Sequence, residues 1–332
     1  MKYGSYYIIV LTLFTLIMLF TGCSKNSEAS SDDSEETGIS AAPSPDGESE
    51  ETEPKLIPKS KKDYLNGSDL PEVSMAVSAK EDAMADMPKS ITIKGVEYPT
   101  TLTSLTLDNM ELTDEDIKDL RYMLNLTELH IYQNHITDLS PIQGLTELKT
   151  LSLFKNNISD LTPLAGLMEL QTLYLRGNNI SDITPIKGLT KITNLDLSDN
   201  QITDISALSE MKGMRLLKLN GNQIKSITPL SGMVMMDRLH LQDNLISDIT
   251  PLSLMTSATE IYLDNNLVTD ISPLTELKNL GWLKLSGNET EDFSPLCDLT
   301  ALKKLYIKNV SVSAEQMDML RENLPDCIFI TQ

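Results

Sequence analysis

The sequence predicts an α/β solenoid: a right-handed coil with a parallel β-sheet on its concave face, 3₁₀ turns on its convex face and helical terminal repeats. Three observations after residue 90 predict this fold. An Asn recurs at intervals of 22 residues, a spaced pair of aliphatic residues precedes each Asn, and a hydroxyl residue, usually followed by Pro, comes after it. The recurring Asn residues are Asn134, Asn156, Asn178, Asn200, Asn222, Asn244, Asn266 and Asn288.

The aliphatic pairs predict the strands. In Leu151-Ser152-Leu153 and its counterparts every second residue is aliphatic, which is the period of a β-strand. A unit of 22 residues cannot bury its own apolar face. Neighbouring units are therefore expected to stack, to pair their strands in parallel and to share one continuous core.

The Asn column is expected to be structural. A carboxamide donates twice and accepts twice, so a buried Asn can satisfy backbone groups of its own turn and of the neighbouring turn. The repetition of one residue type in eight units indicates a role in the coil and not in catalysis.

The hydroxyl column predicts the convex turns. Ser140 and its counterparts are expected as N-caps, because Ser or Thr followed by Pro favours the start of a short helical turn. Few residues remain before the next strand, so the turn is expected to be 3₁₀-like. An Asp two residues earlier, such as Asp138, is expected to stabilise this turn and not to bind calcium.

The full unit, LxxLxLxxNxIxDIxPLxxL in eight tandem copies, resembles the bacterial 22-residue leucine-rich repeat found in internalin-like proteins. The resemblance covers residues 90–332 and implies a leucine-rich repeat solenoid. Both ends depart from the pattern, with Thr113 and Ser313 expected to cap terminal helices. Ile91 and Ile93 are expected to add a capping strand, and Cys327 and Phe329 to occupy the strand positions of Leu305 and Ile307.

The N-terminal residues predict a targeting signal followed by a tether. Residues 1–22 carry Lys2 and a short apolar run, and the sequence Phe20-Thr21-Gly22-Cys23 resembles a lipobox, so residues 1–22 are expected to be a lipoprotein signal peptide and Cys23 to be lipidated. An uncleaved signal anchor is the alternative. Residues 23–89, with many acidic side chains, are expected to form a disordered tether. The expected location is the bacterial cell surface, on the extracellular side of the membrane.

Composition excludes several function classes. The 332 residues have a net charge of −21, which argues against nucleic acid and anionic lipid headgroups as partners. Three Cys and three His are too few and too scattered for a zinc cluster. No phosphate loop or catalytic motif is present, so no enzyme activity, metal or cofactor is expected.

Outward side chains of the strands form the candidate partner-binding surface. The residues selected on aromatic and basic character are His130, Tyr132, Phe154, Tyr174 and Arg176 in one patch, and Tyr262, Trp282, Lys284 and Tyr306, together with His240 and Lys308, in a second. Tyr, Trp and Arg dominate binding hot spots, which favours a protein as the ligand. The chain is expected to be a monomer. The alternatives are that stacked rings merely stiffen the sheet, or that the chain is an envelope scaffold or binds cell-wall glycan. Because internalin-like proteins bind host proteins, the resemblance implies a possible host interaction.

Overall fold

The structure is a computed structural model that describes residues 71–85 and 87–332. The expected signal peptide, the lipidation site at Cys23 and most of the expected tether lie outside the described residues. Within the described part of the chain, no helix has both the length and the apolar character needed to cross a bilayer.

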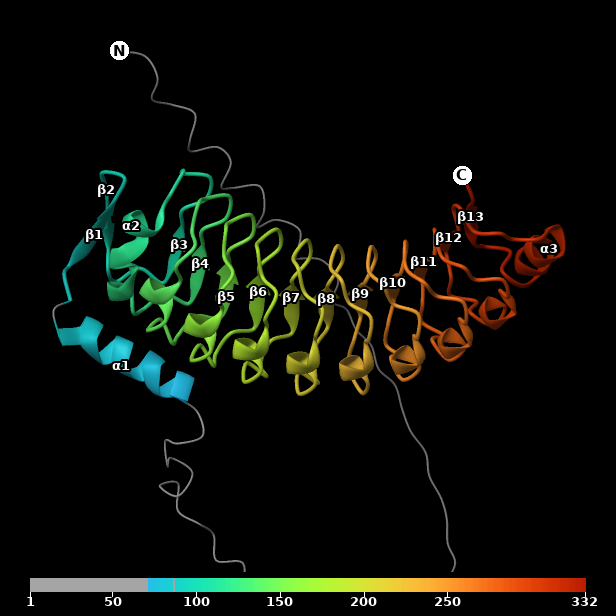
Figure 1. Ribbon diagram of the computed structural model, residues 1–332, viewed down its shortest axis with the longest axis horizontal. Coiled ribbons are helices and arrows are strands. Elements are labelled where there is room, and N and C mark those ends of the chain that lie inside the picture. Colours follow the sequence, from blue (N-terminus) through green and yellow to red (C-terminus); the bar gives the residue numbers. More distant parts are fainter. Residues whose placement is uncertain (1–70, 86) are drawn as a thin grey trace, which may run out of the picture. The chain divides into compact units, whose positions relative to one another are not determined.

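Eleven short parallel strands in the described residues form one sheet, and each strand pairs with the strand of the next unit (Figure 1). The prediction of a parallel-stranded solenoid is confirmed. The strands are β3 (Ser104–Thr106), β4 (Glu128–His130), β5 (Thr150–Ser152), β6 (Thr172–Tyr174), β7 (Asn194–Asp196), β8 (Leu216–Lys218), β9 (Arg238–His240), β10 (Glu260–Tyr262), β11 (Trp282–Lys284), β12 (Lys304–Tyr306) and β13 (Ile328–Ile330).

A 3₁₀ turn lies opposite each of the strands β4 to β11, as predicted. The turns are η3 (Ser140–Ile142), η4 (Thr162–Leu164), η5 (Thr184–Ile186), η6 (Ser206–Leu208), η7 (Thr228–Leu230), η8 (Thr250–Leu252), η9 (Ser272–Leu274) and η10 (Ser294–Leu296). The assignment of the hydroxyl residues as N-caps is wrong. Ser140 is the first residue of its turn, Leu139 is the cap, and the Asp138 carboxylate accepts a 2.8 Å hydrogen bond from the Ser140 amide.

The Asp column therefore stabilises these turns, as predicted. Thr184 donates its amide to Asp182 over 2.8 Å, and hydrogen bonds from the hydroxyl and amide of Thr184 lower the pKa of Asp182. A longer acidic side chain would place its carboxylate beyond this amide, so the geometry explains why the position is Asp and not Glu.

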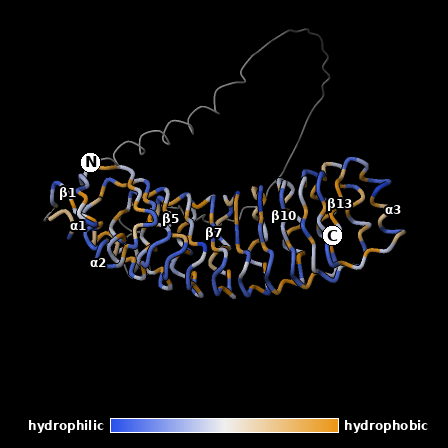
Figure 2. Tube along the Cα trace, turned by 90° about the horizontal axis from the view of Figure 1, so that it is seen from above, coloured by the Kyte–Doolittle hydropathy of each residue, from blue (hydrophilic) through white to orange (hydrophobic). Residues whose placement is uncertain are grey.

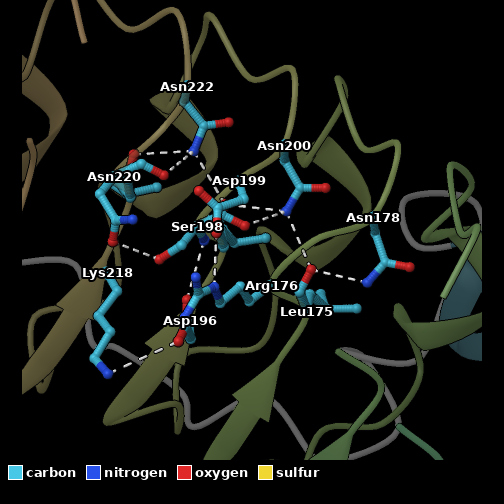
Figure 3. A network of polar contacts seen from close by, with 12 residues as sticks. Leu175, Arg176, Asn178, Asp196, Ser198, Asp199, Asn200, Lys218, Asn220 and Asn222 are labelled. Atoms are coloured by element: carbon cyan, nitrogen blue, oxygen red, sulfur yellow. Dashed lines mark hydrogen bonds and ion pairs between the residues drawn. The ribbon is translucent and has the colours of Figure 1, made fainter. Parts of the chain in front are cut away.

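The recurring Asn residues form a buried ladder, which confirms their structural role (Figure 3). Asn178 donates its Nδ2 to the carbonyls of Leu153 and Leu175, at 3.1 and 2.9 Å, and its Oδ1 accepts from the Ile158 amide at 3.0 Å. Two of these three partners belong to the preceding unit. Each carboxamide thus joins one coil of the solenoid to the next.

The core is a continuous row of aliphatic side chains inside the coil. Leu151, Leu173 and Leu195 from successive strands are fully buried and adjacent to one another. Hydrophobic and hydrophilic residues alternate along each coil (Figure 2). In the unit that precedes β12, Phe293 stands at a repeat position that is aliphatic in the other units, and its side chain is also fully buried.

The N-terminal end is closed by a helical unit and a hairpin. Strands β1 (Ser90–Ile93) and β2 (Val96–Pro99) pair antiparallel in a sheet of their own. Ile91 and Ile93 are buried in β1, which confirms the expected capping strand, and the turn at Lys94 folds this strand onto β2. The helical first unit is confirmed as α2 (Asp114–Ile117) and η2 (Lys118–Tyr122), with the Thr113 amide donating to Asp116 over 2.9 Å.

The C-terminal end is closed by α3 (Ala314–Asn323) and β13. Ser313 caps α3, with its hydroxyl accepting from the Gln316 amide at 3.2 Å. Phe329 pairs with Leu305 and not with Ile307, so the predicted register of the last strand is wrong by two residues. Helix α3 is longer than a 3₁₀ turn and shifts the strand that follows it.

Helix α1 (Pro71–Ala85) is a further correction, because these residues were assigned to a disordered tether. The helix packs beside η2 and η4 with Ala76 and Ala83 buried. Lys80 Nζ donates to Thr146 over 2.9 Å and lies 3.1 Å from a Glu147 carboxylate oxygen. Small apolar residues at the contact allow this helix to lie close against the array.

Gly144 makes this close contact possible, and its replacement by Val is expected to release α1. A Cβ at residue 144 would lie 3.0 Å from the Lys80 amide nitrogen and 3.1 Å from the Ala79 carbonyl carbon. Overpacking of this kind costs about 1–3 kcal/mol, so amide hydrogen exchange in α1 should accelerate by about tenfold. Gly213→Val is the control, because no atom lies within 4 Å of a Cβ there. Equal exchange in both variants would contradict the packing of α1 described here.

Candidate binding face

The parallel register aligns outward side chains of neighbouring strands on the concave face. It divides the residues selected from the sequence into two groups. The N-terminal cluster comprises His130, Tyr132, Phe154, Tyr174 and Arg176, and the C-terminal cluster comprises His240, Tyr262, Trp282, Lys284 and Tyr306.

A stacked ring pair is the centre of the N-terminal cluster. The rings of Tyr132 and Phe154 lie 4.2 Å apart between centroids with an interplanar angle of 11°. The Tyr132 amide donates to Asp108 over 3.0 Å, and burial raises the pKa of Asp108. This hydrogen bond links the backbone of Tyr132 to the preceding unit.

Beside this pair the face is hollowed. A cavity of about 320 Å³ is lined by Phe154, Tyr174, Arg176 and Leu216, together with Lys155, Asp196 and Lys218. Its lining combines aromatic rings with aliphatic and charged side chains. The cavity could accept an apolar side chain with a polar end.

The two basic residues of the N-terminal cluster are engaged within the chain. His130 Nε2 lies 2.9 Å from a Glu128 carboxylate oxygen, and Arg176 Nε lies 2.7 Å from an Asp199 carboxylate oxygen. The free positive charge that the sequence suggested for this cluster is therefore offset by neighbouring acids. Its aromatic rings and not its charges distinguish it.

A polar network separates the two clusters (Figure 3). The Ser198 hydroxyl donates to Asn220 Oδ1 over 2.7 Å, and the Ser198 amide donates to Asp196 over 3.0 Å. Lys218 Nζ lies 3.9 Å from the Asp196 carboxylate. These groups satisfy one another across β7 and β8.

The C-terminal cluster combines aromatic rings with lysine ammonium groups. The His240 and Tyr262 rings stack at 4.3 Å with an interplanar angle of 12°. Lys284 Nζ lies 3.7 Å from the Tyr262 ring centroid and 5.2 Å from that of Tyr306. Each distance is within the range of a cation–π interaction.

Two residues of this cluster were missed by the sequence analysis. Lys304 Nζ lies 5.5 Å from the Trp282 ring centroid. Glu260 is only 9% exposed, and its carboxylate lies 2.8 Å from His240 Nε2. Lys304 and Glu260 are each the first residue of their strand, as Trp282 is. Comparing this position across all units would have identified both.

The buried acid changes the chemistry of its neighbours. Burial lowers the pKa of His240, and the hydrogen bond with Glu260 opposes this effect only in part. Burial also raises the pKa of Tyr262, with Glu260 adding to the shift. His240 is therefore mainly neutral at pH 7, and the positive charge of the cluster resides on its lysines.

The described residues contain no group of three or more His, Cys, Asp and Glu side chains able to hold a metal ion. Cys297 and Cys327 are free thiols, and burial raises the pKa of Cys327 to about 11.

Parallel strands, an Asn ladder and 3₁₀ turns in every unit define the architecture. Residues 124–166 and 169–210 match the family model described as Leucine Rich repeats (2 copies). The fold is a leucine-rich repeat solenoid. Arrays of this kind are common protein-binding modules and are generally non-enzymatic scaffolds. The matches of this chain indicate no catalytic family.

Solved structures agree with this assignment. An internalin, InlF, from Listeria monocytogenes is similar with a TM-score of 0.61 and 25% identity, covering 79% of this chain and 89% of that chain. A leucine-rich repeat protein from Leptospira interrogans has a TM-score of 0.61 and 23% identity, covering 68% of this chain and 59% of its own.

A third similar structure is the ectodomain of a plant membrane receptor kinase from Arabidopsis thaliana, in complex with Casparian strip integrity factor 2. Its TM-score is 0.53 at 19% identity, covering 64% of this chain and 30% of that chain. This likeness concerns the fold alone. No curated protein matches the sequence.

Proposed function

We propose that this chain recognises a protein partner through the concave face of its leucine-rich repeat array. The observation that supports this proposal best is the N-terminal cluster, where Phe154, stacked on Tyr132, lines a cavity together with Tyr174. Aromatic side chains beside a cavity are typical of binding hot spots. Stiffening of the sheet would require each ring to stack on a neighbour, but in the described residues Tyr174 stacks on no other ring.

The cellular setting is part of the same proposal. The chain is a bacterial surface lipoprotein of the internalin-like 22-residue subclass, anchored at Cys23 and displayed by the acidic segment before the array. The lipobox-like sequence and the constant spacing of the Asn column support this assignment, as does the 25% identity to InlF. A role as an adhesin or host-interaction protein follows from the same likeness.

Affinity capture tests the function. The full chain is immobilised and exposed to envelope extract and to host-surface extract, beside a variant with Tyr132, Phe154 and Tyr174 changed to Ser. Because hot-spot residues contribute about 2 kcal/mol or more each, the variant should retain at least tenfold less of the partner. A protein bound by the native chain and lost in the variant supports the proposal.

The matched control changes Val234, Met235 and Leu254 to Ser, since these exposed apolar residues lie outside the strands. It should retain the partner in full. If the native chain captures no protein, or the aromatic variant captures the same protein, concave-face recognition is wrong. The envelope scaffold or wall-glycan function then becomes the better explanation.

A further inference from the structure

The C-terminal end of the concave face carries three lysines that form no ion pair within the described residues. Lys284, Lys304 and Lys308 come from β11, from β12 and from the residue two places after β12. None of the three lies within ion-pair distance of a carboxylate in the described part of the chain. By contrast, Arg176 and Lys218 on the same face each face an Asp carboxylate, at 2.7 and 3.9 Å.

The three lysines neighbour Tyr306 in the sheet or along the chain. In the parallel register Lys284 lies directly beside Tyr306 on the next strand. Lys304 and Lys308 precede and follow Tyr306 on alternate, outward-facing positions of β12 and its extension. Lys284 Nζ lies 5.2 Å from the Tyr306 ring centroid, and Lys304 and Lys308 flank Tyr306 along the chain, on a protein of net charge −21.

The nearby carboxylates are turned to other partners. Glu260 is buried against His240, and Asp264 accepts a hydrogen bond from the Ser286 amide over 2.9 Å. Because both acids are hydrogen-bonded to other groups, the exposed charges of this region are mainly those of the lysines. Charges are screened beyond about 8 Å at physiological salt, so the acidic surface elsewhere contributes little here.

We propose that this lysine–tyrosine surface, formed by Lys284, Lys304, Lys308 and Tyr306, binds an acidic segment of a protein partner. A run of Glu or Asp residues supplies carboxylates that can reach several ammonium groups at once. This inference rests on the proposed function for its location, and it names the chemistry of the partner at one end of the concave face.

The geometry favours an acidic peptide over a glycan. Sugars bind aromatic residues through open ring faces, whereas Tyr262 has His240 stacked on it at 4.3 Å and Lys284 Nζ at 3.7 Å from its centroid. Lys304 lies over Trp282 in the same way. The rings thus hold the ammonium groups in place, which reduces the side-chain entropy lost when a carboxylate binds.

Peptide binding to the full chain tests this assignment. The probe is a fluorescein-labelled peptide of alternating Glu and Ser, compared with the same peptide carrying Gln for Glu. The Glu peptide should bind and the Gln peptide should not. Binding should weaken severalfold between about 50 and about 300 mM salt, because exposed charge pairs are screened. Failure of the Glu peptide to bind, or equal binding of both peptides, would overturn the proposal.

Variants locate the site. Changing Lys284, Lys304 and Lys308 to Gln should weaken Glu-peptide binding by about tenfold, since three charge pairs are lost. The control changes Lys149, Lys187 and Lys225 to Gln, which alters net charge equally at exposed positions outside the strands, and should bind like the native chain. Equal loss in both triple variants would show a nonspecific charge effect and overturn the assignment.

Two further outcomes separate this inference from the proposed function. If polygalacturonate binds this surface and the Glu peptide does not, the acidic-peptide assignment is wrong. The Tyr132, Phe154 and Tyr174 variant should still bind the Glu peptide, because these residues lie in other repeat units. Capture of a protein without Glu-peptide binding refutes only the inference, and Glu-peptide binding without any captured protein supports the inference while refuting the proposed function.

Discussion

Replacing Asn200 by Ala is expected to destabilise the array by about 2–5 kcal/mol, because each buried polar group left without a partner costs about 1–3 kcal/mol. Asn200 Nδ2 donates to the carbonyls of Leu175 and Leu197, and its Oδ1 accepts from the Ile180 amide at 3.1 Å (Figure 3). Leu175 and Ile180 belong to the preceding unit. The variant therefore weakens two coils at once.

Urea unfolding followed by circular dichroism measures this effect. Asn279→Ala is the control, because Asn279 is exposed and makes a single 2.8 Å bond to the Thr256 carbonyl. This substitution should lower the free energy of unfolding by about 1 kcal/mol or less. If the midpoint for Asn200→Ala moves no further than the midpoint for the control, the ladder does not hold the coils together.

Replacing Phe293 by Ala is the second large change, with an expected cost of about 3–5 kcal/mol. Phe293 is fully buried, and its amide donates a hydrogen bond to Gln316 Oε1 over 3.0 Å. Removing the ring leaves a cavity between the last repeats and α3. Since each repeat contacts mainly its neighbours, hydrogen exchange should rise most in the C-terminal units.

Phe154→Ala provides the same chemical change on the concave face. Phe154 is only partly buried and loses mainly its stack on Tyr132, so a cost of about 1 kcal/mol is expected. Thermal unfolding of the two variants gives the comparison. Equal destabilisation would mean that Phe293 does not fill the core as described.

The repeated part of the fold was predictable because its rules are local. Leu151 and Leu153 alternate with outward residues in every unit, and Asn156 follows at a constant distance. Any one unit is ambiguous, but eight units in one register leave a single way to align the strands. The partner groups of the Asn ladder follow from that alignment.

The ends were predicted less well, because they do not repeat. The shift that places Phe329 opposite Leu305 depends on the length of α3, for which the array offers no second example. Helix α1 follows the acidic segment and was assigned to the same tether, and the fit of Ala76 and Ala83 against the convex turns accounts for its position. Its fit also depends on Gly144.

On the candidate face, the sequence identified which side chains point outward but not how they are paired. It could not show that Asp199 neutralises Arg176, since those residues lie in different units and the ion pair depends on side-chain geometry. It also overlooked Lys304 and Glu260, which carry and support the charge of the C-terminal cluster.

The sequence by itself determined the coil, the strand register within the repeats and the structural role of the Asn column, because a periodic pattern specifies contacts between identical neighbours. Only the tertiary structure decided the closure of both ends, the docking of α1 and the distribution of free charge on the concave face. Those features depend on contacts between side chains that occur once in the chain, so no repetition reveals them in advance.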